Sequence, residues 1–315
     1  MGITSLEYGL TDASVHAYAD LAIILGPAFN RYQEAYQFAK LARGLFNKYG
    51  PNEAKAYVCM EQISLWTEPI TTAIDFIRLA FLRCTNNHDL TYACFCCNHL
   101  VTDLLLQGVD LEEVWCESLK GLEFVRKVRS RDRADVIVSQ QRFILNMRGQ
   151  TAAFSSFSDT QFDEAKFEAQ LTEDRMPHLV CYYWILKLQA RFISGDFDAA
   201  IAAAQKAKPL LWSAEFLIES VNYHFYGALA VAAVHEMTEL RVQFGGLKML
   251  RQSLELLREW SRNCPETFRD KYTLVAAEIA PQGRGARACP GQYDRGADGT
   301  AGSCDSAQSV TCDFE

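Results

Sequence analysis

Two helical patterns meet at a glycine in residues 184–207, and only a helical hairpin accommodates that arrangement well. The large apolar residues Trp184, Leu188 and Phe192 recur every four positions, so they share one face of a helix. The pattern breaks at Gly195-Asp196. Glycine tolerates the positive φ that ends a helix, and aspartate caps the helix that follows. The segment therefore predicts two antiparallel helices joined by a tight turn.

The second half of the hairpin carries small residues on its apolar face. Its face residues are Phe197, Ala200, Ile201, Ala204 and Ala207. The alanines at 200 and 207 allow close approach of the first helix. The order of Trp, Gly-Asp-aromatic, first Ala and second Ala is similar to that of the tetratricopeptide repeat, which is roughly 34 residues long. An ordinary helical hairpin in a globular bundle is the alternative interpretation.

Helical periodicity continues along most of the chain, and the short alternating runs typical of strands are nearly absent. Besides the hairpin, we expect helices over residues 13–25, 32–49, 54–66, 70–84, 90–106, 111–128, 134–147, 164–171, 215–235, 240–263 and 268–280. Tyr32-x-x-Ala35 followed by Ala42 repeats the spacing of the central hairpin, but such echoes lie at unequal intervals. We predict an all-α fold over residues 1–280, with antiparallel helical hairpins stacked as a degenerate TPR-like solenoid.

The composition changes abruptly at Pro281. Residues 281–315 are rich in Gly, Ser, Ala and Asp and show no apolar periodicity. Such a segment buries too little apolar surface to offset its ordering entropy, so we predict a disordered tail. An out-of-frame gene end would explain the loss of pattern. The last helix of the fragment would then lack a cap and could self-associate through Leu274, Val275 and Ile279.

The composition excludes several classes of partner. The net charge of −8 argues against nucleic acid or an anionic membrane as the main partner. No apolar run is long enough to span a bilayer, and the first residues lack the pattern of a signal peptide. Several of the 11 cysteines lie in apolar helical runs, where thiols behave as small hydrophobes: Cys59, Cys84, Cys116 and Cys181. We expect a cytoplasmic protein without a disulfide framework.

No catalytic constellation is visible. A P-loop requires Gly-Lys followed by Ser or Thr, and the chain contains no Gly-Lys pair. The kinase catalytic loop and its metal-binding Asp-Phe-Gly are also missing. His235-Glu236 lacks the second histidine of a His-Glu-x-x-His zinc site. We therefore expect a non-enzymatic chain that needs no cofactor.

One cluster contains residue types that bind metal ions and is a candidate metal site. Cys94, Cys96, Cys97 and His99 fall within one expected helix. Structural zinc prefers four converging ligands presented from turns. Cys94 and Cys97 share a face whereas Cys96 points elsewhere, so core packing is favoured over zinc or a redox-sensing thiol. No metal site is predicted.

Three further groups have a plain structural interpretation. Tyr182-Tyr183-Trp184 has helical spacing, which favours a core position over a binding face. His224 is interpreted as a helix residue among aromatic neighbours. The run Arg129–Arg133 is expected to be a solvated connecting loop, with a phosphate-binding patch as the alternative.

Basic residues on otherwise apolar helices are the candidates for partner binding. Lys187 and Arg191 lie one turn apart on a helix that lines the concave surface in repeats of this kind, and Arg142 and Arg148 are placed similarly. Repeat arrays bind through such exposed positions on stacked helices. We predict that these four residues contact a protein partner. Solvated charges without a role are the alternative.

Longer segments resemble one protein family. They are LWTEPITTAIDFIR, LTYAC after Asp89, SQQRFILNMRGQT, FDEAKFEAQLTEDRMP, YYWILKLQARFISGDFDAAIAAAQKAKPLLW and NCPETFRDKYTLVAAEIA. Together they resemble the helical, TPR-like region of bacterial multi-sensor signal transduction multi-kinases, from about residue 4 to residue 280. After Ala280 this chain departs from the family pattern.

The resemblance implies a place in a larger signalling protein. In that family a Ser/Thr kinase-like domain and a P-loop ATPase precede the helical region, and a GAF domain and a histidine kinase follow it. This chain has none of those motifs, so the resemblance implies a non-catalytic scaffold or regulatory region acting through intra- or intermolecular protein contacts. Two alternatives stay open. Kinase, ATP-binding or phosphorelay function would belong to other domains, and a small effector could bind in a groove lined by Lys187 and Arg191.

Overall fold

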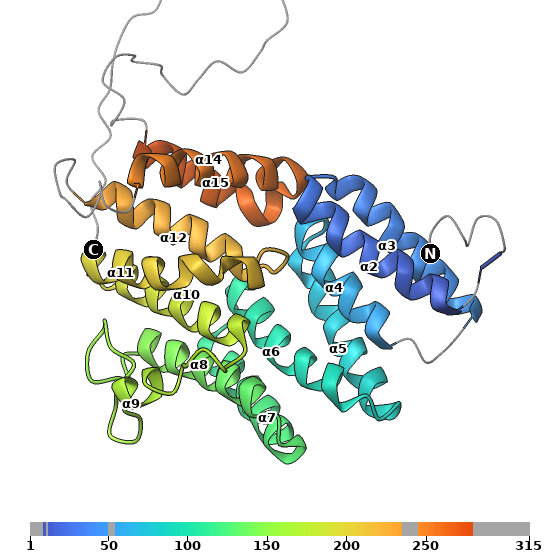
Figure 1. Ribbon diagram of the computed structural model, residues 1–315, viewed down its shortest axis with the longest axis horizontal. Coiled ribbons are helices and arrows are strands. Elements are labelled where there is room, and N and C mark those ends of the chain that lie inside the picture. Colours follow the sequence, from blue (N-terminus) through green and yellow to red (C-terminus); the bar gives the residue numbers. More distant parts are fainter. Residues whose placement is uncertain (1–8, 11, 50–53, 235–244, 280–315) are drawn as a thin grey trace, which may run out of the picture. The chain divides into compact units, whose positions relative to one another are not determined.

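The computed structural model describes residues 9–10, 12–49, 54–234 and 245–279. Within these ranges the chain forms 13 α-helices and one 3-10 helix, and no strand (Figure 1). The first half contains α2 (Asp12–Phe29), α3 (Tyr32–Tyr49), α4 (Ala54–Thr67), α5 (Ile70–Asn86), α6 (Leu90–Gln107), α7 (Leu111–Val128) and α8 (Arg131–Met147). The second half contains α9 (Glu164–Glu168), α10 (Pro177–Ile193), α11 (Phe197–Ala207), η1 (Lys208–Ser213), α12 (Glu219–Ala233), α14 (Gly246–Asn263) and α15 (Pro265–Ile279). The predicted all-α class is confirmed for these residues.

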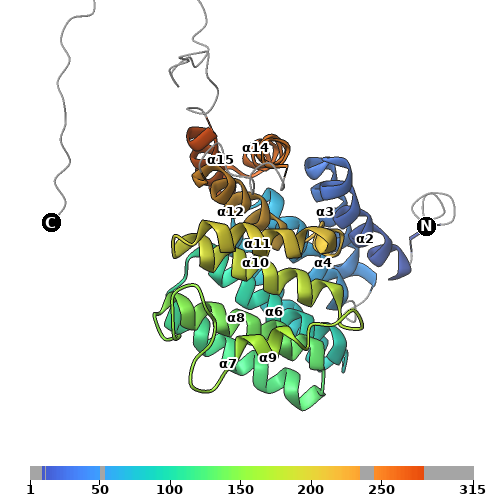
Figure 2. The same cartoon turned by 60° about the vertical axis from the view of Figure 1, so that its left-hand side comes forward.

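Most helices pack against their neighbours in the sequence, as the pairs α2–α3, α4–α5, α10–α11 and α14–α15 show. Every second helix also packs against the next in its series: α2 on α4, α4 on α6, α6 on α8, α8 on α10, and α10 on α12 (Figure 2). Stacked helical hairpins produce this double pattern, because each hairpin buries one face against the hairpin before it.

The central hairpin forms as its sequence predicts. Gly195 ends α10 with a φ of +78°, and the Asp196 side chain accepts a hydrogen bond from the Ala199 amide at 3.2 Å. Ala200 and Ala207 are completely buried between α10 and neighbouring elements. Since neither has a side chain beyond Cβ, the two helices can approach closely.

Several predicted boundaries are wrong: α9 ends at Glu168 rather than at residue 171, α15 begins at Pro265 rather than at residue 268, and three others differ as follows. The helix expected to stop at Gly26-Pro27 continues to Phe29, with Pro27 inside it. Pro27 lies in the last turn, where its missing N–H disturbs only the end of the helical ladder. The run Arg129–Arg133 is not a solvated loop: α7 ends at Val128, Arg129 caps it, and α8 begins at Arg131. The helix expected from residue 215 begins at Glu219, after η1.

An aromatic cluster joins the first and last described hairpins. Trp66 of α4 lies 5.3 Å from Trp260 of α14 and 5.7 Å from Phe268 of α15, measured between ring centroids. Trp260 Nε1 donates a hydrogen bond to the Tyr32 hydroxyl at 2.9 Å. The main hydrophobic core includes all four residues. Helices far apart in the sequence therefore share one core.

The end of α15 differs from the expected bare apolar face. Val275 is buried in the main core, Ile279 packs against that core, and Leu274 is 45% exposed. α12 and α14 pack against α15, so two of the three residues of the expected open face are covered and Leu274 is not. Self-association through this helix stays a prediction, and the predicted tail of residues 281–315 lies outside the described residues.

The buried thiols follow the sequence interpretation with one exception. Cys59, Cys84 and Cys181 are buried, whereas Cys116 is exposed on α7. None of the described helices combines the length and the apolar character that crossing a bilayer requires.

Candidate functional site

The predicted partner-binding residues hold a loop in place. Lys187 of α10 is fully buried and forms an ion pair with Glu164, the first residue of α9. Its ammonium group also lies 4.7 Å from the centre of the Phe157 ring. Arg191 lies 3.8 Å from the same Glu164 carboxylate and donates to the Ala199 carbonyl at 3.2 Å. The expectation that Lys187 is exposed is wrong, because α9 and the loop before it cover this face of α10.

Arg142 and Arg148 are engaged in the same region. Arg142 Nη1 lies 2.5 Å from an Asp159 oxygen, with its guanidinium over the Phe162 ring. Arg148 forms an ion pair with Glu112 of α7, again at 2.5 Å. All four predicted residues are thus bound within the chain. Their binding of an outside partner stays a prediction.

Sequence reasoning missed a fifth basic residue with a similar role. The Arg175 side chain is 4% exposed and binds Asp132 at 2.7 Å and Asp135 at 2.5 Å, both on α8. It precedes Pro177 and so fixes the start of α10 against α8. Its position in a polar connecting stretch gave no sign of burial.

The cysteine group behaves as core. Cys94 and Cys97 pack with residues of α7 and α8, whereas Cys96 packs with residues of α4 and α5. The predicted division between two faces is confirmed. Within the described ranges no three His, Cys, Asp or Glu side chains converge in a way that would hold a metal ion. His99 Nδ1 instead lies 3.1 Å from Glu61 Oε2.

That contact belongs to a buried polar cluster between four helices. Its members are Glu61 of α4, His99 and Asp103 of α6, His178 of α10 and Glu219 of α12, each at most 7% exposed. His178 Nε2 lies 3.5 Å from Glu219 Oε1. Both carboxyl oxygens of Asp103 are buried without a hydrogen-bond partner among the described residues. They face a cavity of about 10 Å³, the size of one water molecule.

Burial sets the protonation of this cluster. It raises the pKa of Asp103 and of Glu61 well above the usual carboxyl range, and neighbouring negative charge adds to both shifts. Burial lowers the pKa of His99. Burial also acts to raise the pKa of Glu219, but His178, His99 and a backbone hydrogen bond together outweigh it, and the net shift is downward. The cluster therefore holds a neutral acid beside a charged one.

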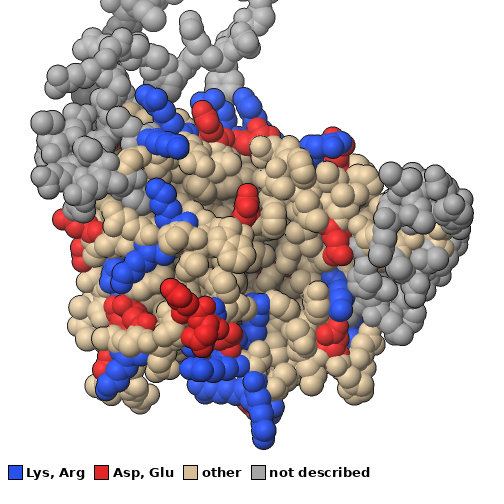
Figure 3. Space-filling model, viewed as in Figure 1, with Lys and Arg blue, Asp and Glu red and all other residues tan. Residues whose placement is uncertain are grey.

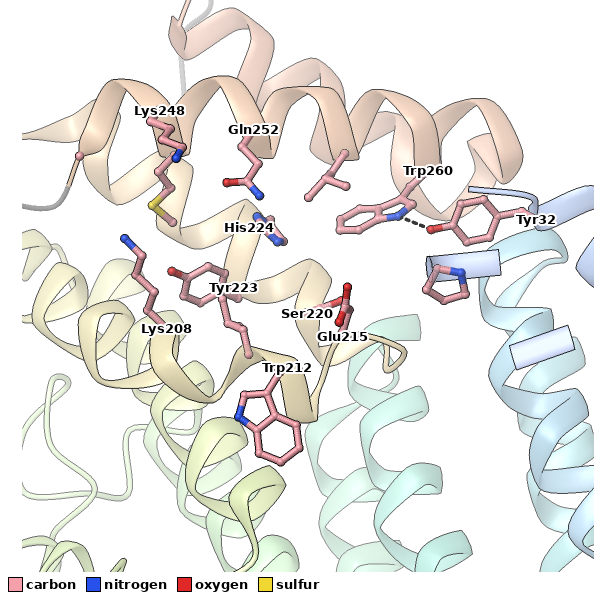
Figure 4. Close-up of a pocket in the computed structure, with 15 residues that line it drawn as sticks. Tyr32, Lys208, Trp212, Glu215, Ser220, Tyr223, His224, Lys248, Gln252 and Trp260 are labelled. Carbon is pink, nitrogen blue, oxygen red and sulfur yellow. Dashed lines mark hydrogen bonds between the residues drawn. The ribbon is translucent and has the colours of Figure 1, made fainter. Parts of the chain in front are cut away.

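A second candidate site is a cavity of about 510 Å³ lined by residues of α2, α3, η1, α12 and α14 (Figure 4). Its volume falls within the range of small-molecule sites. The labelled lining residues are Tyr32, Lys208, Trp212, Glu215, Ser220, Tyr223, His224, Lys248, Gln252 and Trp260. Of these, His224 was singled out from the sequence, and Tyr32 only as part of a repeat pattern. Its predicted aromatic surroundings are confirmed by its contacts with Tyr223 and Trp260.

The polar groups of this cavity are unevenly distributed. Figure 4 shows Lys208, Lys248 and the Tyr223 hydroxyl at one end and Trp260 at the other. His224 lies between them, with Nδ1 3.1 Å from Ser253 Oγ. Burial lowers the pKa of His224 to about 4, so the imidazole is neutral at pH 7. The cavity thus has a cationic end and an aromatic end.

Comparisons with known proteins give one distant relationship. No family model and no solved structure matches the chain. Over 150 residues the chain is 25% identical to hybrid signal transduction histidine kinase G of Dictyostelium discoideum. The match covers 46% of this chain and 4% of that protein. The chain is therefore a helical region distantly similar to part of a signal transduction histidine kinase, which supports the resemblance seen in the sequence only at this coarser level.

Proposed function

We propose that the chain is a non-catalytic regulatory region of a cytoplasmic signal-transduction kinase. In this proposal its stacked, TPR-like hairpins contact other domains of the parent protein or a partner protein. The observation that carries it is the packing of every second helix against the next, from α2 to α12, because arrays of this kind present residues of successive hairpins on a common surface. The distant similarity to a histidine kinase supports the signalling context.

The charge distribution favours a protein partner. On the face shown in Figure 3 acidic and basic side chains lie next to each other, and the chain has a net charge of −8. Mixed charge suits protein contacts, whereas nucleic-acid binding calls for a basic patch.

A small effector held by Lys187 and Arg191 is less well supported as a function. Both residues already contact the Glu164 carboxylate, and Lys187 is buried. A ligand would have to displace α9 to reach them. Kinase and phosphorelay activities are properties proposed for the surrounding domains of a longer protein, where such domains are present.

A phosphotransfer assay tests the non-catalytic role. The purified chain is incubated with γ-labelled ATP and Mg²⁺, and we expect neither autophosphorylation nor ATP hydrolysis above a heat-denatured control. Steady incorporation of label into the chain would overturn the proposal.

A second experiment tests the regulatory role. The gene on both sides of this segment is sequenced, and we expect the same reading frame to encode kinase or ATPase motifs. In that longer protein, deletion of residues 12–279 should leave autophosphorylation intact and abolish its response to signals. A deletion that leaves the response unchanged would contradict a regulatory function.

A further inference from the structure

We propose that the cavity between α3, η1, α12 and α14 binds a small aromatic molecule carrying one anionic group. This site is separate from Lys187 and Arg191, and it goes beyond the regulatory function proposed above. It would stand even if the chain contacted no kinase. The argument rests on the volume of the cavity and on the different chemistry of its two ends.

The end formed by η1 and α14 suits an anion. Lys208 is the first residue of η1, and Lys248 lies in the first turn of α14, where the helix dipole is positive. Gly245, whose φ is +64°, caps this helix and also lines the cavity. Tyr223 is 3% exposed, and its hydroxyl forms no hydrogen bond with another described residue. A carboxylate placed here would meet the Lys248 ammonium group, lie on the cationic side of the cavity near Lys208, and accept a hydrogen bond from the phenol.

The opposite end suits an aromatic ring. Trp260 is 5% exposed, and its only polar atom is bonded to the Tyr32 hydroxyl, so the pair presents ring surface to the cavity. Trp212 lies at the rim with 65% of its surface exposed. An aromatic ligand would cover part of this indole and offset the cost of exposing it.

The groups between the two ends restrict the ligand further. His224 is neutral at pH 7 because burial lowers its pKa to about 4, so it contributes hydrogen bonding without charge. Among the described lining residues Glu215 is the one carboxylate, and Figure 4 places it away from the two lysines. A second anionic group at that end would meet like charge. The geometry therefore favours a monoanion over a dianion extended along the cavity.

Calorimetric titration of the purified chain tests this assignment with four probes. Indole-3-acetate is an aromatic monoanion, indole is neutral, tryptamine is a cation and hexanoate is an anion without a ring. We expect indole-3-acetate to bind with a Kd below about 1 mM and at least about tenfold more tightly than any of the other three.

Variants separate the two ends of the site. Lys248→Gln should weaken indole-3-acetate binding by about tenfold and leave indole binding within about twofold, since one charge-assisted contact is lost. Lys120→Gln, at an exposed lysine of α7 paired with Glu117, is the matched control and should change neither. Trp212→Ala should weaken the binding of both indole-3-acetate and indole. Equal affinity for tryptamine and indole-3-acetate, an unaffected Lys248→Gln variant, or no saturable binding of any probe would each overturn the proposal.

Discussion

Asp103 shows how one side chain can make stability depend on pH. Its carboxyl group is completely buried and has no hydrogen-bond partner in the described part of the chain; Glu61 of α4, His99 of α6 and Glu219 of α12 are its charged neighbours. Burial raises its pKa, so ionisation is harder in the folded than in the unfolded chain. A carboxyl with a raised folded pKa stabilises most at low pH, and that contribution is lost as the pH rises through the folded value.

We expect Asp103→Asn to remove this loss of stability at high pH. The amide is nearly isosteric and cannot ionise, so at pH 8 the variant should unfold with a free energy higher than the wild type by about 1–3 kcal/mol. Near pH 3, where the carboxyl is neutral in both states, the difference should disappear. Urea denaturation across this pH range measures it.

Asp75→Asn is the control for this prediction. Asp75 is exposed on α5, so the substitution should change the unfolding free energy by no more than about 0.5 kcal/mol at any pH. Identical pH profiles for the Asp103→Asn variant and the wild type would show that the buried carboxyl does not control the pH dependence.

Single residues also show why sites were hard to predict. The periodicity around Lys187 correctly places it on an apolar helix, but periodicity cannot reveal that a loop and α9 cover that face. The position of the cavity could not be predicted from the sequence, because its aromatic end pairs Tyr32 with Trp260, which lies 228 positions away. Only the aromatic neighbours of His224 gave a local sign of it.

At the scale of elements, α9 and its loop depend on one buried ion pair. Lys187→Met removes the cation and leaves the Glu164 carboxylate partly buried, although Ser156 and the Phe157 amide still donate to it. We expect a loss of about 3 kcal/mol in unfolding free energy. The double variant Lys187→Met with Glu164→Gln should recover part of it, because the partly buried side chain at position 164 is then neutral, although Arg191 loses its contact with the carboxylate.

Urea denaturation of the four members of this mutant cycle gives the coupling between the two residues. Lys166→Met is the comparison, since Lys166 is an exposed lysine of α9. A Lys187→Met variant as stable as Lys166→Met would mean that the pair does not hold the loop.

Two glycines should respond in opposite directions to the same substitution. Gly195→Ala forces a side chain into a φ of +78° at the α10–α11 turn, and should destabilise by about 1–2 kcal/mol. Gly44→Ala lies inside α3 with open space around the added methyl group, and should stabilise by up to about 1 kcal/mol. Thermal unfolding of both variants measures the two effects. Changes of the same sign would contradict the turn assignment.

Helix boundaries were predictable where turn-forming residues mark them in the sequence, and less so elsewhere. Gly195-Asp196 and Cys264-Pro265 mark turns that the structure contains. Pro27 misled the prediction, because a proline in the last turn of a helix costs little there. The charged run Arg129–Arg133 was also predicted incorrectly. Asp132 forms an ion pair with Arg175, which is distant in the sequence, and the Arg133 guanidinium lies over the Phe95 ring. Charge alone does not distinguish a loop from a helix start whose partners come from elsewhere.

At the scale of the whole helical region, Trp260 couples the first and last hairpins. We expect Trp260→Ala to lower the unfolding free energy by about 3–5 kcal/mol. It should also speed amide hydrogen exchange in α3 as well as in α14, because both lose the same contact. Leu274→Ala, at an exposed position of α15, is the control. Unchanged exchange in α3 would show that the hairpins are stable independently.

The same contact has a consequence for synthesis in the cell. Tyr32 and Trp260 are separated by 228 positions, and at about 5–20 residues per second the ribosome needs roughly 10 to 50 s between them. The early hairpins thus leave the ribosome well before their aromatic partners exist. During that interval the ring surface of Trp66 faces water, and nascent chains in this state are the usual clients of holding chaperones.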